Sequence, residues 1–179
     1  MGALRNSVRE FAFRLDRPGT RWLLSTLMPL YGMFAKDGVR KLQFDSGWIH
    51  TFDDYSVVEP APRARDYFMS QAENQYLWGY LYTPRPGDTV LDIGAHLGWE
   101  SIYYAGKVGP RGRVIAVEAN PIMFGYLERS IKLNNYHNVT CLNFAIAGSA
   151  GNSLSKTTST KVLAMLSPRR VAVACRSRE

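Results

Sequence analysis

An apolar strand that leads into a glycine-rich turn constrains the fold of this chain more than any other feature. Residues 89–101 read TVLDIGAHLGWES, and the first five of them form the apolar run of a buried parallel strand. Asp92 lies near the carboxyl end of this strand, and Gly94 and Gly98 allow the backbone to turn tightly into a helix. A strand, turn and helix of this kind predict a binding site for a nucleotide-like cofactor.

A second apolar strand follows and also ends in an acid. Residues 113–121 read RVIAVEANP, which places Glu118 where a carboxylate can accept both hydroxyls of a ribose. Asn120 can cap the next helix, and Pro121 suits its first turn. Acids at two successive strand ends indicate one ligand at the carboxyl edge of a doubly wound parallel sheet. The alternative is that both acids only cap helices or accept backbone amides.

The spacing of the glycines bears on the kind of ligand. In the dinucleotide fingerprint GxGxxG, the second glycine lets a pyrophosphate touch the backbone, whereas this chain has His96 there. A ligand with a ribose and an adenine but no phosphate fits the turn better, and S-adenosylmethionine is the common one. A nicotinamide-dependent oxidoreductase is therefore disfavoured.

Residues 86–148 resemble the first half of an FkbM-type methyltransferase domain. The resemblance rests on PGD ahead of the first strand, DIGAHLG in the turn and AVEANP after the second strand. The chain departs from the family pattern at His96, Trp99, Glu100 and Ala119. The resemblance implies S-adenosylmethionine as cofactor and transfer of its methyl group to a hydroxyl of a sugar, a lipid or a natural product.

The turn chemistry and the resemblance together nominate the residues of a cofactor site. Asn143 and Phe144 lie at the end of the third expected strand, near the place where the resembled family holds the adenine. The predicted cofactor-binding residues are Asp92, Gly94, His96, Gly98, Glu118, Asn120, Asn143 and Phe144. The alternative roles are close helix packing for the two glycines and a solvated loop side chain for His96.

The sequence nominates no catalytic base. In the resembled family a fourth strand carries a motif like DxxKxDxEG close to the transferred methyl group, and after Asn152 this chain has a single acid, Glu179. We therefore expect an α/β fold with an incomplete, Rossmann-like doubly wound parallel sheet that lacks its catalytic half. A noncatalytic remnant or interaction module is the alternative function, because an unfinished sheet leaves an edge open to self-association.

The periodicity of apolar residues predicts the individual elements. Parallel strands are expected at 89–93, 113–118 and 139–144, with helices at 98–106 and 121–134. Further candidates are a hairpin within 42–58, a helix at 63–82 and a strand at VAVAC, 171–175. Within 63–82, the residues that could contact cofactor or acceptor are Glu73, Tyr76 and Trp78, although an aromatic helix is more often part of a core.

The distribution of charge supports four segments. These are a basic N-terminal extension at 1–41, a lead-in hairpin and helix at 42–85, the cofactor-binding half at 86–150 and a basic tail at 151–179, which we expect to be disordered or outside the native fold. Lys and Arg outnumber acids by eight to three in the first segment and by six to one in the last, whereas acids outnumber bases by eleven to eight between them. Basic ends around an acidic middle do not indicate a nucleic-acid partner.

The N-terminal extension combines basic and apolar residues. Leu4, Val8, Phe11 and Leu15 recur at helical spacing, which predicts either a helix packed on the domain or an amphipathic helix on an anionic membrane. The apolar run at 22–34 is too short to span a bilayer, and Pro29 and Gly32 are expected to interrupt it. The chain is therefore predicted to be cytoplasmic, with any membrane contact made through residues 1–35.

The cysteines and histidines do not suggest a metal site. Cys141 and Cys175 stand alone, without a CxxC pair, which suits a reducing compartment. His50, His96 and His137 are too scattered in the sequence for their spacing to define a set of ligands. No metal is therefore expected.

Overall fold

The computed structural model describes residues 11–33, 38–63, 83–145, 153–155, 158–160 and 171–175. The chain divides into two compact units, Met1–Gln71 and Ala72–Glu179. Among the residues described, none of the helices has both the length and the apolar character that a membrane span requires.

The first unit is an antiparallel sheet with a helix packed against it. Its elements are the helix α2 (Arg21–Gly32) and the strands β1 (Lys41–Phe44), β2 (Trp48–Thr51) and β3 (Ser56–Glu59). The strands pair in the order β1-β2-β3, and α2 packs against β1. The hairpin expected within residues 42–58 is therefore present, and a third strand extends it.

The core of the first unit comes from one stripe of α2 and one face of the sheet. Leu24 and Met28 of the helix are buried with Leu42, Trp48 and Val57 of the strands. Within the apolar run, α2 continues through Pro29 and ends at Gly32. A proline removes one hydrogen bond from a helix, and the packed stripe on both sides of it outweighs that loss here.

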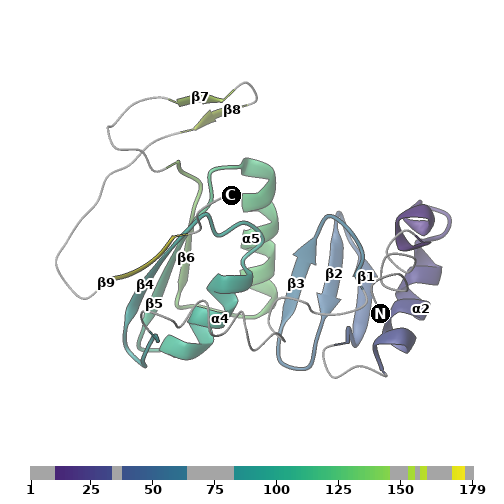
Figure 1. Ribbon diagram of the computed structural model, residues 1–179, viewed down its shortest axis with the longest axis horizontal. Coiled ribbons are helices and arrows are strands. Elements are labelled where there is room, and N and C mark those ends of the chain that lie inside the picture. The colour runs from purple at the N-terminus through teal and green to yellow at the C-terminus, as the bar shows by residue number, and fades with distance from the viewer. Residues whose placement is uncertain are drawn as a thin grey trace. The chain divides into compact units, whose positions relative to one another are not determined.

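The second unit is an α/β structure with a parallel sheet. Its elements are β4 (Thr89–Ile93), α4 (Trp99–Val108), β5 (Arg113–Val117), α5 (Pro121–Leu133), β6 (Val139–Leu142), the short antiparallel pair β7 (Ser153–Ser155) and β8 (Thr158–Thr160), and β9 (Val171–Cys175). The parallel strands lie in the order β6-β5-β4-β9, with α4 and α5 on the same side of the sheet (Figure 1). The fold is thus the Rossmann-like, incomplete parallel sheet expected from the sequence.

The order of the strands follows from two helical crossovers between parallel neighbours. Each of β4 and β5 is followed by a helix and then by its parallel neighbour, so successive strands add in one direction. Val90 and Val114 pack under Tyr104 and Val108 of α4 and form the core of this side. The five strands and helices expected between residues 89 and 144 are confirmed, with ends that differ by one or two residues.

The last strand of the sheet comes from the basic tail. β9 pairs in parallel with β4, with Thr89 opposite Val171 and Ile93 opposite Cys175. The sequence VAVAC therefore forms the strand for which it was a candidate. The helix expected at 63–82 lies outside the described residues, apart from Arg63 at its start.

Candidate cofactor site at the carboxyl ends of β4 and β5

The two predicted acids lie at adjacent strand ends and on the same side of the sheet. Asp92 of β4 stands opposite Ala116 of β5 in the parallel register, and Glu118 comes two residues after Ala116. Because side chains alternate along a strand, this register directs both carboxylates toward the face that carries the helices. Both side chains are buried, with 4% of Asp92 and 8% of Glu118 exposed.

Glu118 connects the two loops that follow these strands. Its Oε2 accepts the backbone N–H of His96 at 2.9 Å, and its Oε1 accepts the backbone N–H of Asn120 at 2.7 Å. These bonds hold the carboxylate in one orientation at the strand ends. A carboxylate offers about four lone-pair directions, so each oxygen keeps one for a further donor.

The turn after β4 approaches β5 closely. The N–H groups of Gly94 and Ala95 both donate to the carbonyl of Val117, at 2.8 and 3.0 Å. Gly94 has φ +82°, and a Cβ added to it would meet no atom within 4 Å. The backbone at Gly94 therefore borders open space next to the loop that carries Glu118. A ligand site requires such space.

Gly98 serves a different purpose from Gly94. Its φ is +93°, and a Cβ there would lie 2.8 Å from Cδ1 of Leu127, a fully buried side chain of α5. The carbonyl of Gly98 accepts the N–H of Ile102 and so opens α4. The structure thus gives Gly98 the helix-packing role that the sequence left as an alternative.

His96 occupies a backbone position that few side chains adopt. Its φ of +52° lies in the left-handed region, where asparagine, aspartate and histidine are the common non-glycine residues. The residue is half-buried, and its backbone N–H is the donor to Glu118. The main chain of His96 therefore belongs to the site by a direct contact.

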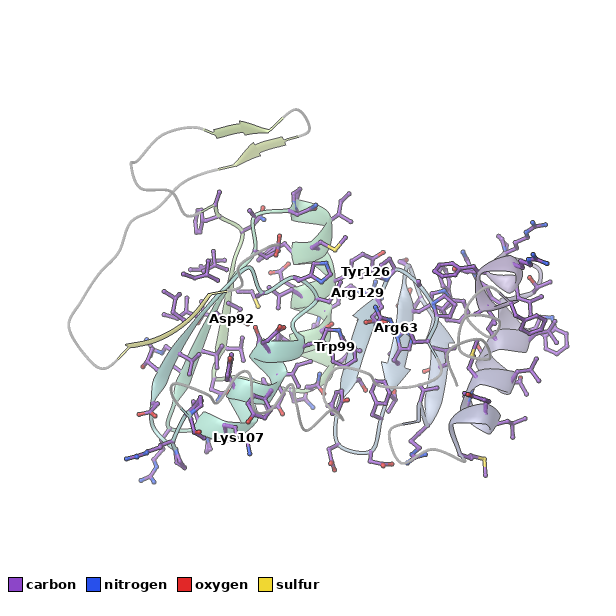
Figure 2. The ribbon with its side chains drawn as sticks, viewed as in Figure 1. Arg63, Asp92, Trp99, Lys107, Tyr126 and Arg129 are labelled. Atoms are coloured by element: carbon purple, nitrogen blue, oxygen red, sulfur yellow. The ribbon has the colours of Figure 1, made fainter. Side chains whose placement is uncertain are left out.

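Asp92, labelled in Figure 2, accepts a hydrogen bond from the first turn of α4. The hydroxyl of Ser101, itself fully buried, donates to its Oδ2 at 2.5 Å. Burial raises the pKa of the Tyr104 hydroxyl, and the negative charge of Asp92 adds to this shift. Burial likewise raises the pKa of the Cys141 thiol to about 11, with the charges of Glu128 and Asp92 as smaller causes. The negative charge of Asp92 thus contributes to the raised pKa values of both Tyr104 and Cys141.

Asn120 and Asn143 fix the loop that carries Glu118. The side chain of Asn120 accepts the N–H groups of Ile122 and Met123 and caps α5, as the sequence predicted. Asn143 Nδ2 donates to the carbonyl of Glu118 at 2.7 Å. Phe144 is half-buried just beyond the end of β6. Hydrogen bonds therefore join His96, Glu118, Asn120 and Asn143 into one group, whereas Asp92 bonds to α4.

Two residues of this site were missed from the sequence. Ser101 bonds to Asp92, and its only signal was a hydroxyl residue one helical turn after the glycine turn. Leu127 packs against Gly98, and nothing in the sequence pairs a leucine in the second helix with a glycine of the first turn. Both contacts depend on how α4 and α5 sit on the sheet.

The arrangement fits the adenosine and sulfonium parts of S-adenosylmethionine. Glu118 is oriented by two amides and keeps acceptor capacity for ribose hydroxyls. Gly94 leaves space beside the main chain. Neither 92–100 nor 116–123 contains a lysine or an arginine, so the loops present carboxylates toward a ligand that itself carries positive charge.

Comparison with known proteins yields matches to methyltransferases. The chain is 41% identical over 59 residues to protein-L-isoaspartate O-methyltransferase of Aeropyrum pernix, which is 33% of this chain and 23% of that protein. It is 34% identical over 80 residues to protein-L-isoaspartate O-methyltransferase of Methanopyrus kandleri, 45% of this chain and 35% of the relative. It is 39% identical over 54 residues to arsenite methyltransferase of Halobacterium salinarum, 30% and 14% of the two chains. The chain thus matches about a third or less of the length of each relative.

Solved structures of methyltransferases also resemble this chain over part of its length. The fibrillarin of Aeropyrum pernix, solved with natively bound S-adenosyl-L-methionine, aligns with a TM-score of 0.37 at 18% identity, over 59% of this chain and 56% of that one. A SAM-dependent methyltransferase of Aquifex aeolicus aligns with a TM-score of 0.37 at 23% identity, over 43% and 44%. No protein-family model matches the chain.

The relatives that match in sequence are all methyltransferases, but their names give different methyl acceptors. The proteins that match in sequence are named for methyl transfer to a protein residue or to arsenite. Methyl transfer is thus the activity that these relatives share, which agrees with the class of enzyme expected from the sequence. The narrower FkbM-type prediction is not confirmed.

Proposed function

We propose that this chain is an S-adenosylmethionine-dependent methyltransferase, or the cofactor-binding part of one. The observation that carries the proposal is the carboxylate of Glu118, which two backbone amides orient at the end of β5, beside the open turn at Gly94. The sequence matches to methyltransferases support it independently.

The charge of the strand ends favours this cofactor over a dinucleotide. A nicotinamide dinucleotide would bring two phosphates to loops that hold Asp92 and Glu118 and no basic residue between 92 and 100 or between 116 and 123. S-adenosylmethionine instead brings a sulfonium, an ammonium and a carboxylate group, so that its net charge is positive. Like charges in a partly buried site repel strongly, whereas opposite charges attract, so the electrostatics discriminate in the proposed direction.

The proposed reaction is methyl transfer to a hydroxyl oxygen of a sugar, a lipid or a natural product. This part rests on the resemblance to FkbM-type proteins, and the relatives act on other acceptors. When bound, the cofactor supplies an electrophilic methyl group. The residues of this chain would hold the ribose through Glu118 and keep the turn open at Gly94, while the residue that removes the acceptor proton is left unassigned.

Calorimetric titration of the full chain with S-adenosylhomocysteine tests cofactor binding. Glu118→Gln removes the charge that accepts the ribose hydroxyls, and each hydrogen bond to a charged group contributes about 1.5–3 kcal/mol, so we expect binding weaker by about 100-fold or more. Glu128→Gln is the matched control, because Glu128 is an exposed acid of α5. It is expected to bind like the wild-type protein.

A second pair of variants separates binding from folding. Gly94→Ala and Gly87→Ala each place a Cβ at a positive φ, +82° and +92°, with no atom within 4 Å. Their losses of stability should therefore be alike, while only Gly94→Ala fills space at the proposed site and weakens binding. Equal affinities in the two variants, or saturable binding of NAD in place of S-adenosylhomocysteine, would contradict the proposed site.

One observation favours a noncatalytic role. Both oxygens of Glu118 already accept backbone amides, which is also what a purely structural acid would do. If this is its whole role, Glu118→Gln destabilises the second unit and S-adenosylhomocysteine gives no heat with the wild-type chain. Binding without methyl transfer to any offered hydroxyl acceptor would support a cofactor-binding module that needs a further catalytic part.

A further inference from the structure

The first unit exposes a continuous apolar face on α2. Four exposed apolar residues recur at helical spacing on the side of the helix that faces away from the stripe packed on the sheet. They are Trp22, Leu27, Leu30 and Met33, here called the outer face of α2. Trp22 is 65% exposed, Leu30 51% and Met33 67%. Figure 2 shows side chains standing out from α2 on the side opposite β1.

Exposed apolar residues concentrate in this part of the molecule. Among the described residues, seven of the ten exposed large hydrophobic side chains fall within residues 11–33, including Phe11, Phe13 and Tyr31. Phe11, which belongs to the N-terminal apolar pattern, is 51% exposed, whereas the neighbouring Ala12 is buried. Clustered exposure on this scale marks an interaction surface.

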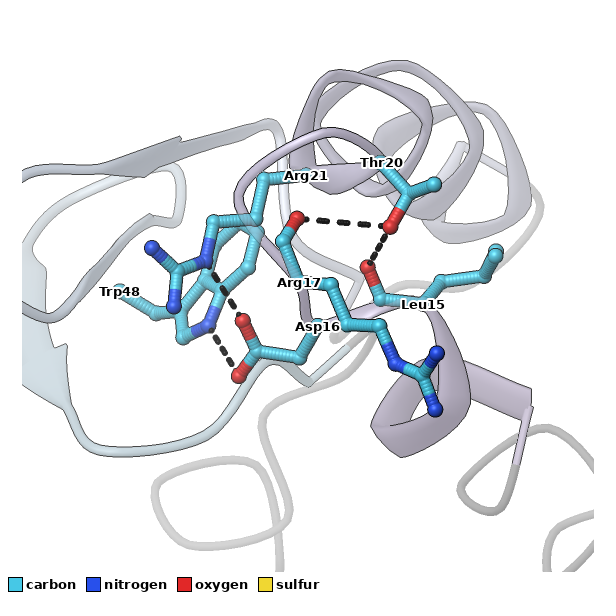
Figure 3. Close-up of polar contacts among 6 residues, drawn as sticks. All are labelled: Leu15, Asp16, Arg17, Thr20, Arg21 and Trp48. Carbon is cyan, nitrogen blue, oxygen red and sulfur yellow. Dashed lines mark hydrogen bonds and ion pairs between the residues drawn. The ribbon is translucent and has the colours of Figure 1, made fainter.

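Contacts at both ends of α2 hold the outer face outward. At its start, Asp16 accepts hydrogen bonds from Arg21 at 2.8 Å and from the indole N–H of Trp48 at 3.0 Å (Figure 3). At its end, the guanidinium of Arg40 donates to the carbonyl of Gly32 at 3.2 Å and to Asp53 at 2.8 Å. The helix therefore cannot roll to bury its outer face without breaking these bonds.

The outer face offers almost nothing to a polar partner. Thr26, which lies between Trp22 and Leu30, donates its hydroxyl to the carbonyl of Trp22 at 3.1 Å, within the helix. Protein interfaces carry about one hydrogen bond per 100–200 Å², and this face supplies few donors or acceptors for them. Insertion into the acyl region of a bilayer requires no hydrogen-bond donors or acceptors on the helix surface.

The exposed charges that shortly precede α2 in the sequence are positive. Within residues 11–33 the acid Asp16 is paired with Arg21, and the exposed residues Arg14 and Arg17 have no ion pair within the described part of the chain. Basic residues next to an apolar helix surface attract anionic lipid headgroups. Trp22 and Tyr31 add the amphipathic aromatic rings that prefer the membrane interface.

We propose that the outer face of α2 docks this protein on the surface of an anionic lipid bilayer. The helix would lie in the interface plane, with Trp22, Leu30 and Met33 in the acyl boundary and Arg14 and Arg17 at the headgroups. This inference is independent of the proposed methyltransferase function, since it uses only the first unit.

The test is co-sedimentation of the full chain with vesicles of phosphatidylcholine, alone or with a third of phosphatidylserine. The triple variant W22S/L30S/M33S removes three apolar contacts. Because burial of apolar surface drives insertion, loss of these three side chains predicts vesicle binding weaker by about 100-fold. The matched control I122S/L133S removes two exposed apolar side chains of the second unit and should bind as the wild-type chain does.

Separate variants test how charge and how insertion of apolar side chains contribute to vesicle binding. The variant R14Q/R17Q is expected to lose the preference for phosphatidylserine while keeping any binding to phosphatidylcholine, and added salt should reproduce its effect. Brominated lipids should quench the fluorescence of the wild-type chain more than that of Trp22→Phe. The proposal is overturned if the chain does not sediment with anionic vesicles, or if the triple variant and the control bind equally. It is also overturned if the triple variant changes self-association in sedimentation velocity but leaves vesicle binding unchanged.

Discussion

Replacing Gly98 by alanine tests how tightly the cofactor turn is packed on α5. Two costs are expected. The positive φ of +93° disfavours any L-residue by roughly 1–2 kcal/mol. The added Cβ would also lie 2.8 Å from Cδ1 of Leu127, which is fully buried, and forcing extra volume into a packed core costs about 1–3 kcal/mol.

Gly87→Ala isolates the second cost. Gly87 lies in the same unit at φ +92°, but no atom is within 4 Å of its would-be Cβ, so it carries the backbone penalty alone. We expect Gly98→Ala to lose about 2–5 kcal/mol and Gly87→Ala about 1–2 kcal/mol, a difference of roughly 1–3 kcal/mol that belongs to packing.

Hydrogen–deuterium exchange is the assay suited to a chain of two units. Peptides from α4 and α5 report the local free energy of opening, and peptides from β1, β2 and β3 serve as an internal reference. Shortening Leu127 to alanine should relieve the clash, so the double variant G98A/L127A should be more stable than the sum of the two single changes predicts. Equal losses in Gly98→Ala and Gly87→Ala, together with additivity in the double variant, would refute the packing argument.

Two further predictions concern buried polar groups. Ser101→Ala should cost the second unit about 1–3 kcal/mol in urea unfolding, because it leaves Asp92 buried with one donor fewer, whereas Ser130→Ala, which removes a neutral bond to a backbone carbonyl, should cost less. His50 is fully buried, and burial lowers its pKa from 6.5 to about 3, so between these values the unfolded chain binds more protons than the folded one. Stability should therefore fall as the pH drops below 6.5, by up to about 3 kcal/mol near pH 4.5, and the urea midpoint of His50→Asn should depend less on pH. A midpoint of the wild-type chain that is constant from pH 7 to 4.5 would contradict the shift.

The elements of the second unit could be predicted because their signals are local. An apolar run, a glycine turn and a second apolar run fix β4, α4 and β5, and the pair Asn120 and Pro121 marks the start of α5. The right-handed crossover rule then supplies the parallel order of the strands. Each of these inferences uses residues that are neighbours in the sequence.

The roles of individual site residues could not be predicted, because they depend on distant neighbours. Gly94 and Gly98 share a positive φ, yet one borders open space and the other touches Leu127, 29 positions away in the sequence. Glu118 accepts the N–H of His96, 22 positions away, only because β4 and β5 align in one register. Pro29 lies within α2 although prolines usually end helices, since packing of the helix on β1 outweighs the lost bond.

The two interpretations of Glu118, as a structural acid and as a cofactor ligand, describe one physical arrangement. The amides of His96 and Asn120 fix its carboxylate before any ligand arrives, and immobilising a long side chain upon binding would otherwise cost about 0.5–1.5 kcal/mol. The same bonds join the turn after β4 to the loop after β5, so a ligand on this carboxylate also ties the two strand ends together. In such a site the fold itself contributes to binding affinity, because the hydrogen bonds that stabilise the two loops also preorganise the Glu118 carboxylate.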